Sequence, residues 1–209
     1  MKKSKAILMA LCAVLLVAAS VMGTLAYLTS TDTVTNTFSV GNVAITMDEK
    51  DVDNSTPDAA RDKANAYKLV PGHKFEKDPI IHVASTSEDC FLFVKVVNEI
   101  ADIEEKGTTD APAATTVAAQ MAAKGWAPIN EGSNVYVYIG TEAGAADPVA
   151  VTANANVTVF ENFTISGTVT NEQLAAYTGK TITVTAYAIQ ADGFADKTAA
   201  QIWGDAGFS

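Results

Sequence analysis

Hydrophobic and polar positions alternate with a period of two along several short stretches of this chain, which is the pattern of half-buried β-strands. In residues 134–140 the odd positions are aliphatic and the even positions aromatic, namely Val135, Val137, Ile139, Tyr136 and Tyr138. In residues 180–190 the even positions from Ile182 to Ala188 are apolar, and the odd positions opposite them are mostly threonine. We therefore expect one face of each strand to enter a core, with the tyrosines presented on the opposite face.

Seven segments carry a strand pattern and are separated by turn residues. They are residues 37–48, 79–84, 91–98, 134–140, 157–160, 163–169 and 180–190. Short helices are expected at residues 112–124, at 171–177 with Asn171 as the N-cap, and at 195–203. So many short strands predict an all-β fold, a jelly-roll-like antiparallel β-sandwich with short helical insertions.

The first of these strands contains a change of register. Its apolar positions are even-numbered before Gly41 and odd-numbered after Asn42. A strand keeps both halves on one face only by inserting a residue, so we expect a β-bulge or sharp bend at Gly41, with two separate strands as the alternative. The polar residues 50–68 show no apolar period and are expected to form a long loop or a poorly ordered excursion.

The first 26 residues follow a different pattern. Three lysines precede a mostly apolar stretch over residues 6–22, and small residues come before Tyr27. This arrangement predicts a secretory signal peptide that is helical and is cleaved between Ala26 and Tyr27. An uncleaved membrane anchor is the alternative, because 17 apolar residues are near the minimum that spans a hydrocarbon core of about 30 Å. Residues 27–209 are then a single secreted domain.

Charge and cysteine content narrow the possible partners of that domain. Its 183 residues carry 11 basic and 24 acidic side chains, a net charge of −13. Phosphate backbones and anionic lipid headgroups repel such a chain, so nucleic-acid binding is not expected. Cys90 is the only cysteine left after signal removal, so no intrachain disulfide forms, and we expect it to be a buried hydrophobic residue.

Candidate catalytic and metal-ligating residues are few, and we predict no catalytic residues, metal or cofactor. His73 and His82 with Glu76 or Asp78 offer a two-histidine, one-carboxylate set, but the zinc-helix and nucleophile motifs are missing. The acidic residues within 48–54 offer oxygen ligands to calcium. Because this cluster lacks the alternating acid spacing and the glycine of an EF-hand loop, we interpret it as a solvated loop.

Three sequence elements occur in a recognisable order. They are Asn36-x-Phe38-x-x-Gly41, then Pro71-Gly72, then Lys77-Asp78-Pro79. With the end of the signal peptide, they resemble the TasA/camelysin family of exported proteins from Gram-positive bacteria, whose signal peptides are removed by SipW-type peptidases. The similarity covers roughly residues 13–97. Within it, these elements are structural motifs.

The resemblance implies a jelly-roll protein that polymerises into fibres of an extracellular biofilm matrix. By the same resemblance, each subunit would donate its mature N-terminal segment as a strand to a neighbour. The donor here would be residues 27–35, whose Tyr27, Leu28 and Val34 would fill side-chain pockets. The same residues as an ordinary flexible N-terminus are the alternative.

The resemblance also implies partners and leaves other functions open. A SipW-type signal peptidase would process the chain, and an accessory matrix protein is a further candidate partner. The alternative functions are a camelysin-like metal-dependent endopeptidase and a monomeric accessory or ligand-binding surface protein.

Overall fold

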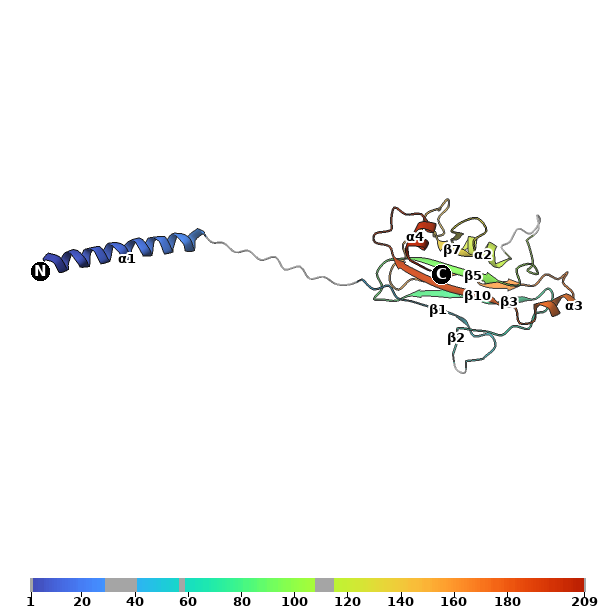
Figure 1. The fold of residues 1–209 in the computed structure, drawn as a ribbon. Helices are drawn as coiled ribbons and strands as arrows, with labels where there is room; N and C mark the ends of the chain where they lie inside the picture. Colours follow the sequence, from blue (N-terminus) through green and yellow to red (C-terminus); the bar gives the residue numbers. More distant parts are fainter. Residues whose placement is uncertain (1, 29–40, 57–58, 108–114, 209) are drawn as a thin grey trace. The chain divides into compact units, whose positions relative to one another are not determined.

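The computed structural model describes residues 2–28, 41–56, 59–107 and 115–208 of the chain (Figure 1). It divides into two units, Met1–Val40 and Gly41–Ser209. The first unit contains helix α1 (Lys2–Leu28), which extends two residues beyond the expected cleavage position at Ala26. Within the part of the chain that the structure describes, no helix has the length and hydropathy needed to cross a membrane.

The second unit is mostly antiparallel β-structure in three sheets. Its strands are β1 (Ile45–Lys50), β2 (Arg61–Asp62), β3 (Lys74–Glu76), β4 (Ile80–Val83), β5 (Cys90–Asn98), β6 (Trp126–Pro128), β7 (Val135–Tyr138), β8 (Asn156–Thr158), β9 (Asn162–Thr164) and β10 (Ile182–Gln190). The two larger sheets have the orders β2-β1-β4-β8 and β10-β5-β7-β6, and β3 pairs with β9. Neither larger sheet closes on itself, so each keeps two edge strands.

Short helices connect these strands. They are α2 (Val117–Ala123), α3 (Asn171–Leu174), which continues as the 3₁₀ helix η1 (Ala175–Tyr177), and α4 (Ala199–Asp205). The expected N-cap at Asn171 is wrong. Thr170 caps α3, because its hydroxyl accepts from the N–H of Gln173 while the Gln173 side chain accepts from the Thr170 N–H.

All seven expected strand segments contain a strand, but the first is shorter than predicted. β1 begins at Ile45, and residues 41–44 are not in a strand. The φ of Gly41 is not positive, so this glycine does not adopt the left-handed backbone conformation that is common for a bulge glycine. What favours glycine there is a close approach, since a Cβ would lie 3.3 Å from Cγ of Glu88. Residues 37–40, with Phe38, lie outside the described residues, as does Asn36.

The polar stretch 50–68 is folded over its described residues rather than poorly ordered. Residues Arg61 and Asp62 form β2, which pairs with the end of β1. The amide of Asn65 also holds the loop, because it accepts from the N–H of Val52 at 2.7 Å and donates to the carbonyl of Lys50 at 2.8 Å. A two-residue strand is too short to show a period in the sequence, so neither β2 nor the three-residue β3 and β6 was predicted.

One main hydrophobic cluster receives side chains from all three sheets. Its fully buried members include Ile81, Leu92, Trp126, Phe160 and Phe163. A second cluster is formed by side chains of β5, β7 and α4, namely Phe91, Phe93, Val135, Val137 and Ile202. In Figure 1, α4 is drawn next to β7. The central strand β5 is therefore buried on both faces, and Cys90 is a buried hydrophobic residue, as predicted.

The two-sided burial corrects the prediction for β7. Val135 and Val137 face the second cluster, as expected of core residues. Tyr136 and Tyr138 are half-buried against the main cluster instead of being presented on a free face. The reason is that the sheet containing β7 is covered on both sides, which alternation along one strand does not show.

Candidate functional site

A cleft of about 1110 Å³ is lined by residues of β1 and β10 beside the main hydrophobic cluster. The loop formed by residues 63–69 and the α3–η1 segment supply the remaining walls. Its apolar lining includes side chains that are half-buried and pack against the main cluster, namely Ile45, Met47, Ile182, Val184 and Ala186. The cleft therefore gives access to hydrophobic surface beside two strands.

The side of β1 that faces this cleft has free backbone groups. The carbonyl of Ala44 accepts from the N–H of Ala84 at 2.9 Å. With the register of β1 and β4, this bond means that the even-numbered residues of β1 hydrogen-bond to β4. Since successive residues of a strand direct their N–H and C=O groups to opposite edges, those of Ile45 and Met47 point away from β4. β2 pairs only with Glu49 and Lys50, so in the described ranges no strand pairs with Ile45 or Met47 on that side.

β10 presents a longer edge that has no partner strand among the described residues. The N–H of Glu99 donates to the carbonyl of Thr181 at 3.0 Å, and the N–H of Ala191 donates to Asp89 at 2.8 Å. Odd-numbered residues of β10 therefore bond to β5, and the even-numbered ones direct their backbone groups to the outer edge. These outward residues are Ile182, Val184, Ala186 and Ala188, and none of them has a strand partner on that side among the described residues.

The geometry of the cleft limits how a further strand can bind. Some Cα atoms of β1 and β10 are within 8 Å of one another. A strand hydrogen-bonded to both edges at once would hold them about 9.6 Å apart, since neighbouring strands are about 4.8 Å apart. Where the two strands are closest there is therefore no room for a further strand between them, so an added strand can pair only with a part of one edge that lies away from this approach. β10, with nine residues, offers the longer edge.

An ion-pair network fixes the wall of the cleft nearest β1. Lys77 Nζ lies 2.6 Å from Oε2 of Glu49, and both side chains are largely buried. Arg61, the only arginine of the sequence, binds the carboxylate of Asp48 and lies 2.9 Å from Oδ2 of Asp78. The Lys77-Asp78 element thus joins β1, the residue 50–68 loop and the start of β4.

Asp48 also contacts a histidine. His82 Nε2 lies 3.1 Å from Oδ1 of Asp48, and its Nδ1 lies 2.6 Å from Oδ1 of Asn156. Burial lowers the pKa of His82, but these two hydrogen bonds outweigh it and raise the pKa above its ordinary value. Burial raises the pKa of Asp48, whereas the bonds from Arg61 and His82 lower it further than burial raises it.

The remaining motif residues, Pro71, Gly72 and Pro79, take part in a turn and in backbone hydrogen bonds. Val70, Pro71, Gly72 and His73 form a turn closed by a 3.1 Å bond from the His73 N–H to the Val70 carbonyl. Gly72 has φ of 70°, which the third position of a type II turn requires and which a side chain would disfavour. The carbonyl of Pro79 accepts from the Val159 N–H at 2.9 Å.

The two histidines of the imagined metal site have separate surroundings. His73 contacts the ring of Phe75, with centroids 4.6 Å apart, while His82 binds Asp48 and Asn156. Within the described residues, the only group of three ligand-bearing side chains close enough to share a metal ion is Asp51, Asp53 and Asp62. Neither histidine belongs to it.

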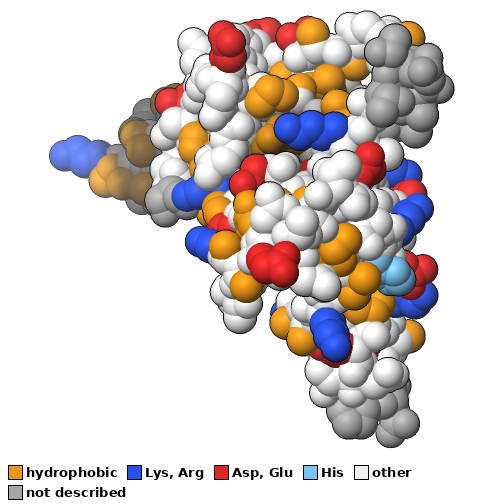
Figure 2. All heavy atoms as spheres, turned by 90° about the vertical axis from the view of Figure 1, so that its right-hand side faces the viewer, with side chains coloured by type: hydrophobic (Ala, Val, Ile, Leu, Met, Phe, Trp, Pro, Cys, Tyr) orange, Lys and Arg blue, Asp and Glu red, His pale blue; other side chains and the backbone are white. Residues whose placement is uncertain are grey.

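The charged side chains are mixed on the face shown in Figure 2. Acidic and basic groups are interspersed there, and hydrophobic side chains lie in small groups between them. On this face, acidic side chains are therefore mixed with basic ones and do not form a surface of one sign.

The predicted donor strand is only partly described. Tyr27 and Leu28 form the end of α1, and residues 29–35, with Val34, lie outside the described residues. Sequence reasoning missed the cleft and the ion-pair network. The single arginine, placed within an acidic stretch, was the one available signal for the network. Comparison with family models, curated proteins and solved structures found no match.

Proposed function

We propose that this protein is a secreted structural subunit that forms fibres of a biofilm matrix by donating residues 27–35 as a strand to the cleft of a neighbouring copy. The observation that carries the proposal is the pair of free strand edges beside an accessible apolar core. An added strand would satisfy the outward backbone groups of β10 and bury the cleft lining at the same time.

The donor segment suits such a site. It has nine residues, which matches the length of β10, and it is rich in threonine. Leu28 and Val34 are an even number of positions apart, so both side chains would lie on one face of the extended segment. That face would contact the apolar cleft, while the backbone would pair with the edge strand.

The proposal extends to fold type, processing and location. Two four-stranded sheets that share one core favour the jelly-roll-like β-sandwich that the sequence predicted. A SipW-type peptidase would release the donor segment by cutting after Ala26, and assembly would then occur outside the cell. An accessory matrix protein is a second possible occupant of the cleft.

The cleft also supports the alternative function of a monomeric ligand-binding surface protein. A cleft of about 1110 Å³ is also large enough to hold a small ligand. The endopeptidase alternative gains no support, since the two histidines have separate surroundings.

The test compares the chain that begins at Tyr27 with one that begins at Asn36. Electron microscopy and size-exclusion chromatography should show fibres for the longer chain and monomers for the shorter one. A synthetic peptide of residues 27–35 should bind the shorter chain one to one, whereas a matched peptide with Leu28→Asp and Val34→Asp should not. A longer chain that stays monomeric under all conditions, or a shorter one that still forms fibres, would overturn the proposal.

A further inference from the structure

A lysine, a glutamate and an asparagine meet in the wall of the cleft nearest β1. Glu49 lies on β1, Lys77 precedes β4, and Asn65 belongs to the loop that follows β2. Lys77 Nζ lies 2.6 Å from Oε2 of Glu49, and Nδ2 of Asn65 donates to Oε1 of the same carboxylate at 3.1 Å. One carboxylate thus contacts an amine through one oxygen and a side-chain amide through the other.

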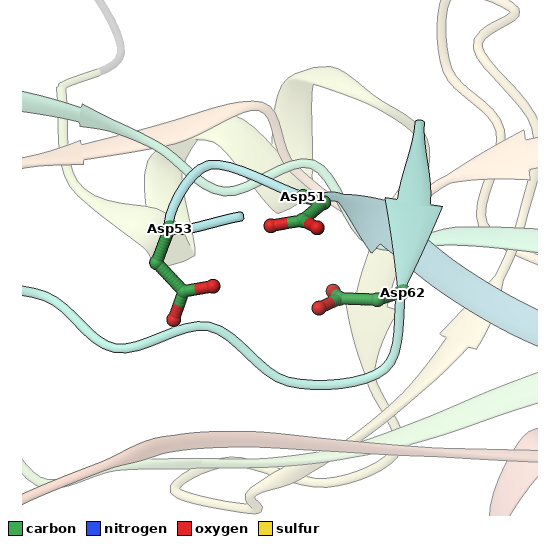
Figure 3. Close-up of side chains that lie close together, drawn as sticks. All are labelled: Asp51, Asp53 and Asp62. Carbon is green, nitrogen blue, oxygen red and sulfur yellow. The ribbon is translucent and has the colours of Figure 1, made fainter. Parts of the chain in front are cut away.

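The pairing of β2 with β1 places the asparagine beside the glutamate. Asp62 of β2 is the ladder partner of Glu49. Figure 3 shows Asp62 across from Asp51 and Asp53, which follow β1. Asn65 comes three residues after Asp62, and its Nδ2 lies 3.3 Å from Oδ1 of that aspartate. The amide of Asn65 is therefore held next to β1 by the loop that β2 begins.

Backbone groups fix the orientation of the Asn65 amide. Its Oδ1 accepts from the N–H of Val52 at 2.7 Å, and its Nδ2 donates to the carbonyl of Lys50 at 2.8 Å. Because a backbone N–H only donates and a carbonyl only accepts, a reversed amide would lose both bonds. The amide nitrogen therefore faces Glu49, while the amide oxygen faces a hydrogen-bond donor.

Lys77 and Glu49 form the most enclosed ion pair among the described residues. Their side chains are 12% and 6% exposed, whereas both partners of every other pair are at least 26% exposed. Removing two charges from water is costly, and the transfer of one proton from the ammonium to the carboxylate leaves two neutral groups. An enclosed lysine beside a base has the surroundings of an activated amine nucleophile.

We propose that Lys77 and Asn65 form an intramolecular amide bond, with Glu49 as the general base and acid. The Lys77 amine attacks Cγ of Asn65, so that a bond forms between Nζ and Cγ while Oδ1 takes the electron pair of the carbonyl. The N–H of Val52 already donates to Oδ1 and stabilises the charge that develops there. The attack requires a change in the lysine side-chain torsions, which its flexible stem allows.

The bond between Cγ and Nδ2 of Asn65 then breaks. Two protons leave the lysine nitrogen during the reaction, and Glu49 passes both to Nδ2, which departs as an ammonium ion. The products are one secondary amide and one ammonium ion, so charge is conserved and no oxidant or further reactant is consumed. Contact of both reacting groups with one carboxylate supplies the proximity that a reaction between separate molecules lacks.

The bond would act as a covalent cross-link in the wall of the cleft. It would join the loop over residues 63–69, which lines the cleft, to the segment before β4. A cross-link of this kind restricts the unfolded chain and stabilises the fold, as a disulfide does. This wall would then keep its position whether or not a strand occupies the cleft.

Peptide mass mapping of the full chain tests for the bond directly. The folded protein is purified, denatured and digested with trypsin, which cuts after unmodified lysine and arginine. We expect a branched peptide of residues 64–68 joined to residues 75–95, because trypsin does not cut at a modified Lys77. Its mass should be lower by one ammonia than the sum of the two peptides. Separate peptides of residues 64–68 and 75–77, or a link from Lys77 to a peptide without Asn65, would overturn the proposal.

Three variants separate this chemistry from a structural role of the same residues. Lys77→Arg keeps a positive charge beside Glu49 but has no amine nucleophile, so it should give no branched peptide. Glu49→Gln removes the proton acceptor and should slow the formation of the branched peptide after refolding at least about a hundredfold. Lys197→Arg, in an exposed ion pair with Asp205, should leave its formation unchanged.

The mass readout does not respond to a merely structural contribution of these side chains. A folded Glu49→Gln chain that forms the branched peptide at the unmodified rate would refute the role of Glu49 in the reaction. The measurement also does not depend on fibre formation, so the failure of either proposal leaves the other standing.

Discussion

Successive residues of β10 direct their backbone N–H groups to opposite edges of the strand. We therefore expect proline to affect stability differently at two adjacent positions. The N–H of Thr185 points toward Lys95 of β5, whereas the N–H of Ala186 points toward the cleft. Thr185→Pro removes a ladder hydrogen bond and leaves a strand carbonyl without its donor, which costs about 1–3 kcal/mol of unfolding free energy. Ala186→Pro removes no backbone hydrogen bond between strands that the structure describes, and proline is tolerated where its nitrogen faces outward from an edge strand.

Both variants restrict φ in the same strand, but Thr185 is exposed and Ala186 packs against the main cluster, so the predicted order requires the lost hydrogen bond to outweigh any packing cost at Ala186. Urea unfolding should place Thr185→Pro about 1–3 kcal/mol below Ala186→Pro in stability, with similar m-values. Under the fibre proposal, Ala186→Pro should stay folded but monomeric, because its ring occupies the position where an added strand would accept a hydrogen bond. If Ala186→Pro is the less stable variant, the assigned parity is wrong. If it is folded and still forms fibres, β10 does not accept the donor strand.

Three further predictions concern steric contact, pH and charge. Gly125 and Gly144 have similar positive φ values of 85° and 83°, but a Cβ on Gly125 would lie 2.3 Å from the carbonyl oxygen of Gly140, and nothing lies within 4 Å of one on Gly144. Gly125→Ala should therefore lower the unfolding free energy by about 1–3 kcal/mol more than Gly144→Ala in urea titrations, and equal losses would contradict the packing. The raised pKa of His82 means that its stabilising effect is fully present below the unfolded value of 6.5 and is lost as pH rises through the folded value. His82→Gln should thus destabilise the protein more at about pH 5.5 than at about pH 8 in thermal unfolding, and a pH-independent difference would refute the assignment. Because residues 27–209 carry a net charge of −13, fibre growth followed by light scattering should quicken with added salt or mild acid, and indifference to both would count against assembly.

The local elements were predictable because their signals lie within a few residues of sequence. Alternation over residues 180–190 located β10 and its core-facing residues, such as Val184 and Ala186, which do pack against the main cluster. The alanine-rich stretch near residue 120 became α2. The errors at Asn171 and at residues 41–44 concern ends of elements, where a single hydrogen bond or close contact decides the boundary.

The candidate sites were less predictable because each joins separate parts of the chain. The cleft needs the free edges of β1 and β10, and no pattern within either strand shows which edge lacks a partner. The ion pairs of Arg61 likewise depend on the fold of a loop whose sequence has no period. The motif residues Lys77 and Asp78 were found from the resemblance, but their partners came from the structure.

The sequence by itself determined the strand segments, the apolar face of β10, the burial of Cys90 and the separate character of the first 26 residues. These properties follow from side-chain type and from periods of two to four residues. Only the tertiary structure decided that β5 is covered on both faces, that one edge of β10 has no partner among the described strands, and that Asp62 meets Asp51 and Asp53. The physical reason is that strand pairing and charge clustering join residues distant in sequence, so they depend on how the sheets come together.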